Sequence, residues 1–157
     1  LSSQPFVLFL DADILLRPTA LETFYRTLQQ HSEAAYVYSS HYFGWKLFTA
    51  LPFNPRTLRE KNYIHTSSLM RREAFSGFDE ALRKFQDWDL WLTMCARGQN
   101  GFALQEALFQ VKPHKEGMSH WLPSILHRIP WEKIGWMPRE LKKYRTAEKI
   151  IRDKHGI

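Results

Sequence analysis

The sequence predicts an α/β protein, because apolar runs typical of strands alternate with a segment of helical periodicity. Residues 6–10 (Phe-Val-Leu-Phe-Leu) form an unbroken apolar run rich in β-forming residues, as in a strand buried on both faces. A helical pattern follows at 20–28, and a second strand pattern at 34–39. This order predicts a parallel α/β unit. With 157 residues, 44% of them hydrophobic, the chain is long enough for one domain with a sizeable core.

The chain is basic, with a formal net charge of +6, which favours an anionic partner such as nucleotide phosphates, nucleic acid or an acidic membrane surface. Much of the excess of positive charge lies late in the chain, so it does not indicate a strongly basic active cleft. A single cysteine, Cys95, excludes an internal disulfide and fits a reducing compartment. No apolar run is long enough to span a bilayer.

The first predicted strand ends in two carboxylates, Asp11 and Asp13. Side chains two residues apart along an extended chain point the same way, so the two carboxylates can converge. The C-terminal edge of a buried parallel strand is where α/β proteins bind ligands. Two close carboxylates repel, and a shared divalent cation such as Mg²⁺ or Mn²⁺ removes that repulsion. The alternative is a strand that ends in solvent, with one aspartate capping a turn.

The predicted helix at 20–28 has Pro18 in its first turn, and Thr19 and Glu22 have capping-box spacing. Its core-facing stripe is Leu21, Phe24, Tyr25 and Leu28. After the second strand, residues 41–61 predict a long loop with short helical pieces, of the kind that shapes a binding cleft. Most of its aromatic residues are expected to form a small hydrophobic cluster.

A second helix is predicted from Gln86, after extended residues 63–70 and a turn at 76–80 that contains Gly77. The helix has a buried face and ends at Gly98; that face consists of Trp88, Trp91, Leu92 and Cys95. Asp87 and Asp89 occupy its first turn, where the helix dipole favours acids.

The chain is predicted to end in a short strand at 107–111 and a tail of aromatic, aliphatic and basic residues from 121 onward. The tail could be a helical arm over the domain or an amphipathic contact with a membrane surface. Its prolines argue against one long helix, whereas residues 138–154 predict a helix with a basic face. We therefore expect two parts, 1–120 and 121–157.

Three features stand in a fixed order: Asp11-Ala12-Asp13, the turn Gly77-Phe78-Asp79-Glu80, and Gln86-Asp87-Trp88-Asp89 at a helix start. With these features, residues 5–120 resemble family 2 glycosyltransferases of the GT-A fold. The resemblance implies a Rossmann-like, mostly parallel sheet with flanking helices, here as a partial domain plus a helical C-terminal tail. The family's first βα units, which hold the nucleotide base, would precede Leu1, so we expect a chain without the N-terminal nucleotide-binding part.

The resemblance implies roles for individual residues. Asp11 and Asp13 would hold the metal and, through it, the donor diphosphate. His114 would be a further metal ligand, with a plain loop histidine equally open and His120 as the fallback. Asp87 would be the catalytic base, with a helix N-cap as the structural alternative.

The resemblance also implies an acceptor site formed by Gly77, Phe78, Asp79 and Trp88, although for Asp79 we favour a turn cap. Two positions depart from the family pattern. Ser76 replaces a glycine, and Gln86 replaces a glutamate beside the base, which leaves the base in place but changes the acceptor surroundings.

The implied activity is metal-dependent, inverting transfer of a sugar from a nucleoside-diphosphate donor, a UDP-sugar foremost, to a hydroxyl of a saccharide or lipid-linked acceptor. Such transfer would serve cell-envelope polysaccharide or glycoconjugate synthesis. A divalent cation (Mn²⁺ or Mg²⁺) stabilises a leaving diphosphate, and a carboxylate is a sufficient base when the leaving group is good. The resemblance implies a cytoplasmic protein at the inner membrane face, with the C-terminal tail as a peripheral membrane contact.

Three other interpretations stay open. A haloacid-dehalogenase-type phosphatase also ends a strand in two aspartates, but a threonine normally follows closely, and here Ile14-Leu15-Leu16 follows. A basic binding module is less favoured because no recognised nucleic-acid motif is present, so we expect no nucleic-acid partner. The chain could also be a truncated, inactive remnant of a transferase.

Overall fold

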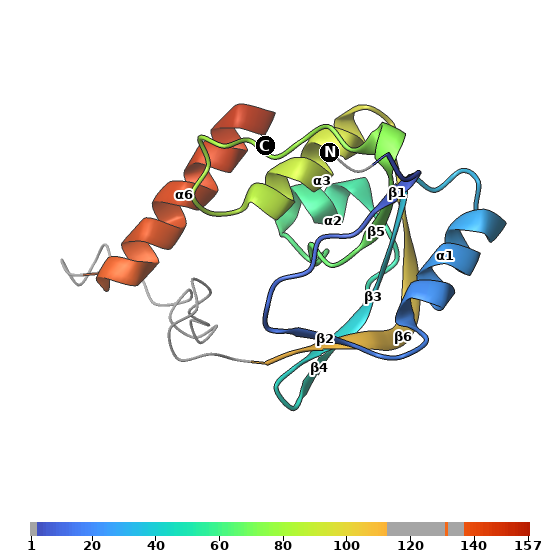
Figure 1. The fold of residues 1–157 in the computed structure, drawn as a ribbon. Coiled ribbons are helices and arrows are strands. Elements are labelled where there is room, and N and C mark those ends of the chain that lie inside the picture. Colours follow the sequence, from blue (N-terminus) through green and yellow to red (C-terminus); the bar gives the residue numbers. More distant parts are fainter. Residues whose placement is uncertain (1–2, 113–130, 132–136) are drawn as a thin grey trace.

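The computed structural model describes residues 3–112, 131 and 137–157, and it has the predicted α/β class (Figure 1). A curled sheet separates helix α1 on one face from helices α2, α3 and α6 on the other (Figure 1). The strands are β1 (Phe6–Val7), β2 (Ile14–Leu16), β3 (Tyr36–Phe43), β4 (Lys46–Phe48), β5 (Leu69–Arg71) and β6 (Gly101–Val111). The helices are α1 (Ala20–Gln30), α2 (Pro55–Glu60), α3 (Gln86–Ala96), α6 (Arg139–His155) and the 3-10 turn η1 (Arg72–Ala74).

The sheet is mixed, which corrects the expected mostly parallel arrangement. Its strand order is β1-β5-β3-β6-β2, and β4 also pairs with β3. Only β3 and β6 run parallel among the described pairs; the other four pairs are antiparallel. The parallel pair is joined by a long crossover that contains α2 and α3, whereas β3 and β4 are joined by a tight turn at Gly44, which has φ 58°.

The first strand is shorter and more exposed than its apolar sequence predicts. Strand β1 covers only Phe6–Val7, lies at the end of the strand order, and pairs antiparallel with β5 alone. The residues that follow leave the sheet, and Leu10 is 49% exposed. The expectation of a strand over 6–10 buried on both faces is therefore wrong for this structure: β1 is a two-residue edge strand whose residues are only half-buried.

Helix α1 forms as expected, and two of its four predicted core residues, Phe24 and Leu28, are buried. Its buried residues are Ala20, Phe24, Thr27 and Leu28, whereas Leu21 and Tyr25 are about half exposed. Thr19 makes no side-chain capping hydrogen bond, and Pro18 lies before the helix instead of in its first turn. The helix is rotated from the predicted orientation because its small residue, Ala20, and the methyl-bearing Thr27 face the sheet.

The larger hydrophobic core lies between β3 and α3. Tyr36 and Trp91 are fully buried, and their rings stack with centroids 4.5 Å apart. Gly101 begins β6 where a Cβ atom would lie 2.3 Å from a ring carbon of Tyr36, so the close approach of these two strands requires a glycine. Helix α3 ends as predicted: Gly98 follows its last turn with φ 74°.

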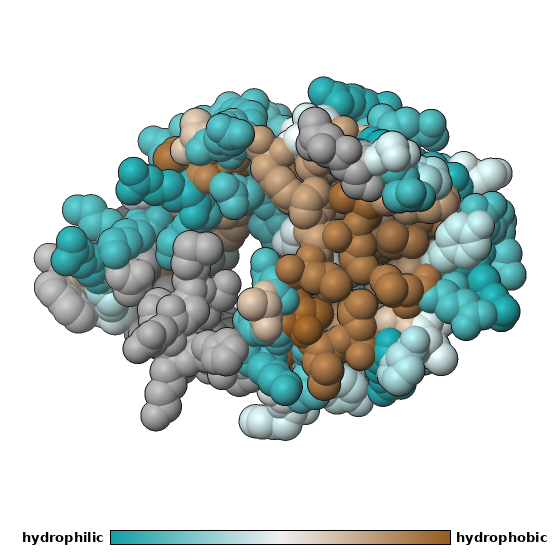
Figure 2. Space-filling view, in the orientation of Figure 1, coloured by the Kyte–Doolittle hydropathy of each residue, from teal (hydrophilic) through white to brown (hydrophobic). Residues whose placement is uncertain are grey.

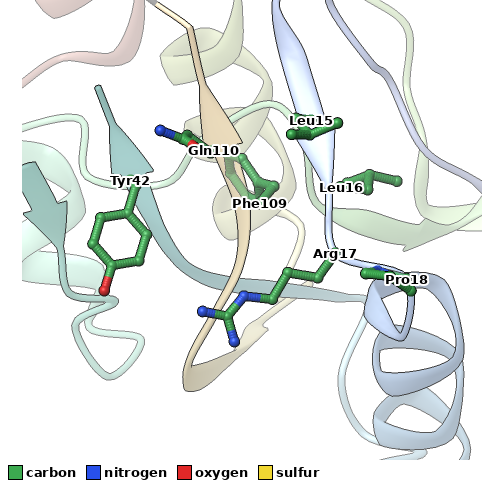
Figure 3. Close-up of a pocket in the computed structure, with 7 residues that line it drawn as sticks. All are labelled: Leu15, Leu16, Arg17, Pro18, Tyr42, Phe109 and Gln110. Atoms are coloured by element: carbon green, nitrogen blue, oxygen red, sulfur yellow. The ribbon is translucent and has the colours of Figure 1, made fainter. Parts of the chain in front are cut away.

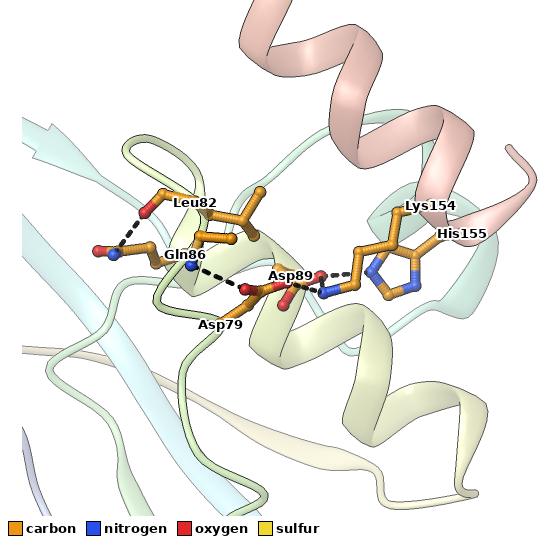
Figure 4. A network of polar contacts seen from close by, with 7 residues as sticks. Asp79, Leu82, Gln86, Asp89, Lys154 and His155 are labelled. Atoms are coloured by element: carbon orange, nitrogen blue, oxygen red, sulfur yellow. Dashed lines mark hydrogen bonds and ion pairs between the residues drawn. The ribbon is translucent and has the colours of Figure 1, made fainter.

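Helix α6 is joined to helix α3 by a buried carboxylate (Figure 4). One Asp89 oxygen, Oδ1, lies 2.8 Å from Lys154 Nζ and 2.8 Å from His155 Nε2, and Lys154 Nζ also lies 2.7 Å from Asp79 Oδ2. Ile151 of α6 belongs to the same core as Trp91. None of the described helices is long and apolar enough to cross a membrane.

Replacing Asp89 with alanine should destabilise the fold, because Lys154 and His155 would lose a charge-assisted, buried acceptor. We expect a loss of about 2 kcal/mol or more in the free energy of unfolding, measured with urea. The control is Glu22→Ala, which breaks an exposed ion pair with Arg26 and should change stability by about 0.5 kcal/mol or less. Equal effects of the two substitutions would contradict the prediction.

Candidate active site

The candidate site is centred on Asp87, in the first turn of α3. Its Oδ1 accepts a hydrogen bond from the backbone N–H of Trp88 (2.8 Å), and its Oδ2 accepts one from Asn62 Nδ2 (2.7 Å). Burial raises the pKa of the Asp87 carboxyl, and the hydrogen bonds from Asn62 and Trp88 oppose that rise. A carboxylate with a raised pKa is a better proton acceptor, as a general base requires.

Two tryptophans of α3 fix the segment that carries Asn62. Trp88 Nε1 donates to the carbonyl of Leu58 (2.7 Å), and Trp91 Nε1 donates to the carbonyl of Ile64 (3.0 Å). Asn62 lies between these two anchors, so the helix that positions Asp87 also positions its hydrogen-bond donor. Asn62 was not singled out from the sequence, where an asparagine before an extended segment carries no distinctive signal.

Asp11 and Asp13 lie in a turn between β1 and β2, not at the end of a parallel strand. Ile14 N donates to Asp11 O (3.0 Å), and Lys112 N donates to Asp13 O (2.9 Å), which fixes the turn against the end of β6. Asp11 is exposed and Asp13 is half-buried. The charge of Asp11 contributes to the raised pKa of Asp87, so the fold brings this aspartate within electrostatic range of the candidate base.

The second aspartate, Asp13, lies within electrostatic range of His65, a histidine that sequence analysis did not select. Burial lowers the pKa of His65 to about 4, and the charge of Asp13 opposes this shift. His65 Nδ1 accepts from Ser67 N (3.0 Å), which places the proton of the neutral ring on Nε2. His41 packs against it with ring centroids 5.0 Å apart, and burial lowers the pKa of His41 to about 4 as well. The only available sequence signal was a polar ring within an extended segment.

The residues expected to bind the acceptor have mainly structural contacts. Phe78 packs against Phe9 with ring centroids 4.9 Å apart. Asp79 Oδ1 accepts from Ala81 N (2.9 Å), as in the favoured turn-cap interpretation. Trp88 is 2% exposed, so it supports Asp87 from the core and offers almost no surface to an acceptor. Gly77 has φ 90°, which shapes the turn before α3.

The turn into α3 is held in a strained conformation. Phe85 has φ 61°, the only positive φ outside glycine in the described residues. Its ring contacts Tyr144 of α6 (4.9 Å between centroids) and Trp88 (5.7 Å). Burial raises the pKa of the Tyr144 hydroxyl, and the charges of Glu148 and Asp87 add to the rise, so α6 also borders the candidate site.

The carboxylates of Asp11 and Asp13 are the side chains suited to a divalent cation that is bound together with a phosphate ligand. The described residues contain no group of three or more His, Cys, Asp or Glu side chains that could hold a metal ion alone. Mg²⁺ in enzymes is commonly held by one or two carboxylates plus substrate phosphates, and the accessible pair Asp11 and Asp13 has that character. His114 and its fallback His120 lie outside the described residues.

Comparison of the chain with protein-family models gives no match, and comparison with curated proteins gives none either.

Asp87 should give the protein a characteristic pH dependence of stability. Because its pKa is raised above the usual 3.8, the folded state holds this proton more tightly than the unfolded state. The resulting destabilisation is complete above the folded pKa and disappears as the pH falls through that pKa to below 3.8. In urea unfolding, wild type should therefore gain stability relative to Asp87→Asn on acidification. Asn62→Ala, which removes a donor to Asp87, should enlarge the effect; a pH-independent difference would contradict it.

Proposed function

We propose that this chain is a metal-dependent, inverting glycosyltransferase of the family 2, GT-A type. The observation that carries the proposal is the half-buried, hydrogen-bonded carboxylate of Asp87, which Asn62 and the Trp88 amide hold in the first turn of α3. With Asp11 and Asp13 it makes up the set that the resemblance implies: an accessible acidic pair for a donor diphosphate and a separate carboxylate for the acceptor. A phosphatase of the dehalogenase type would not need the second, half-buried carboxylate on α3.

In the proposed reaction Asp11 and Asp13 would hold a divalent cation, which would stabilise the negative charge of the leaving diphosphate. Asp87 accepts the proton of the acceptor hydroxyl while that oxygen forms a bond to the anomeric carbon. The bond from the anomeric carbon to the diphosphate oxygen breaks in the same step, so the configuration inverts. Asn62 holds Asp87 Oδ2, and the Trp88 amide holds Oδ1, which fixes the direction in which the base can act.

The proposed donor is a nucleoside-diphosphate sugar, a UDP-sugar foremost, and the proposed acceptor is a saccharide or lipid-linked hydroxyl. We place the reaction in cell-envelope polysaccharide or glycoconjugate synthesis, in the cytoplasm at the inner membrane face. The mixed sheet agrees with an α/β fold in general, and the finer GT-A assignment rests on the sequence motifs.

Calorimetry with UDP tests the donor site. Wild type should bind UDP in the presence of Mn²⁺ and much more weakly without it. Asp13→Asn should weaken the Mn²⁺-dependent binding by about tenfold or more, because one of two carboxylate ligands is lost. Asp153→Asn, the same change at an exposed aspartate of α6, should leave binding unchanged. Metal-independent binding would contradict the donor site. If wild type does not bind UDP, the same titration on a chain extended upstream of Leu1 decides, and a second absence of binding would contradict the donor site.

Asp87→Asn tests the base. Release of UDP from UDP-glucose or UDP-N-acetylglucosamine, with water as the acceptor, should fall about 10²- to 10⁴-fold because proton transfer is lost. Binding of UDP with Mn²⁺ should remain close to wild type, since Asp87 is not a proposed metal ligand. The proposal fails if Asp87→Asn turns over as fast as wild type or as fast as the Asp153→Asn control.

A further inference from the structure

One end of the sheet carries a row of side chains outside both hydrophobic cores. The register pairs Leu47 with Tyr42, Tyr42 with Gln110, and Gln110 with Leu15, so four adjacent strands contribute one residue each. Residues paired in this way project from the same face. Leu47 is 48% exposed and Leu15 54% exposed, and none of the four belongs to either buried core. Helix α1 packs elsewhere, on Val37, Leu69 and Leu108.

The row continues into the hairpin between β3 and β4. Trp45 lies at the hairpin tip and is 92% exposed, the largest exposure among the large hydrophobic side chains described. Gly44 turns the chain there with φ 58° and lets the tip project. Lys46 follows directly, with its ammonium 5.0 Å from the ring centre of Phe48. We call Leu15, Tyr42, Trp45 and Leu47 the hairpin face.

A pocket of about 510 Å³ adjoins the hairpin face (Figure 3). Its lining combines apolar and polar side chains: Leu15, Leu16, Arg17, Pro18, Tyr42, Phe109 and Gln110. Arg17 extends over the pocket (Figure 3). Its Nη1 lies 3.7 Å from Glu106 Oε1, and both side chains are about half exposed. That long, exposed ion pair is weak, so the guanidinium can bind an incoming phosphate.

The chemistry of this surface favours a membrane over a protein partner. An indole and a tyrosine beside aliphatic side chains, with Arg17 at the margin, is the composition that settles at the boundary between lipid headgroups and acyl chains. Basic groups in such a patch select anionic lipids, and the formal net charge of +6 adds a long-range attraction. Hydrophobic side chains also gather on the face shown in Figure 2, over the region between β1 and β2.

We propose that the hairpin face docks on an anionic lipid surface, with Trp45 at the headgroup level and Arg17 bound to a lipid phosphate in the adjoining pocket. Asp13 directly precedes β2, which carries Leu15, so docking places the candidate active site next to the membrane. This contact does not depend on the proposed transferase activity.

Co-sedimentation with lipid vesicles tests the proposal on the full chain. Wild type should bind vesicles of phosphatidylcholine mixed with phosphatidylglycerol more tightly than vesicles of phosphatidylcholine alone, and added salt should weaken that binding. Trp45→Ala should weaken binding by about tenfold or more, and Arg17→Gln by about fivefold. Trp45 is 92% exposed and Arg17 makes only a weak, half-exposed ion pair, so neither change should alter the thermal unfolding of the protein.

The matched control is Ile150→Ser, on α6, because Ile150 is 50% exposed and lies away from the hairpin face. It should bind vesicles as wild type does, whereas Leu47→Ser, at nearly the same exposure, should not. The proposal is overturned if wild type does not prefer anionic vesicles, or if Trp45→Ala and Leu47→Ser bind like wild type. The latter result would assign membrane binding to another part of the chain. If the hairpin face binds a protein and not vesicles, its partner is not a lipid surface.

Discussion

The candidate site depends on two indole hydrogen bonds made by helix α3. Trp88 and Trp91 donate to the carbonyls of Leu58 and Ile64, and both indoles are buried in the main core. The segment between those carbonyls carries Asn62 to Asp87 and leads directly into His65. Packing of α3 on the sheet therefore positions Asp87, its hydrogen-bond donor Asn62 and the nearby His65 together. A loss of core packing would disturb the geometry of the site.

The site has two sides with opposite electrostatic character. On the inner side burial raises the pKa of Asp87 and keeps His41 and His65 neutral at physiological pH. On the outer side Asp11 is exposed to water and Asp13 partly so. A charged ligand such as a diphosphate would meet the solvated acids through a cation, while proton transfer would occur at the drier carboxylate. This separation assigns different chemistry to carboxylates of the same residue type.

The local features of the fold were predictable from the sequence, and the pairings between distant segments were not. Helix α3, its glycine terminator and its first-turn acids follow from periodicity and capping rules that depend on neighbouring residues only. The apolar run before Asp11 gave no indication that β1 would be a short, antiparallel edge strand, because strand partners are set by tertiary contacts. For the same reason Asn62 and His65 were missed: their importance comes from what α3 and Asp13 bring beside them.

The strained turn at Phe85 links two parts of the molecule energetically. A glycine would adopt φ 61° without strain, whereas a phenylalanine holds it at a cost of about 1–3 kcal/mol. The ring contact with Tyr144 of α6 helps to offset that cost, so undocking of α6 would allow the first turn of α3 to relax. Asp87 and the docked C-terminal helix therefore share one support. A substitution that removes the ring contact between Phe85 and Tyr144 would act on the first turn of α3, which carries Asp87, without touching the carboxylate itself.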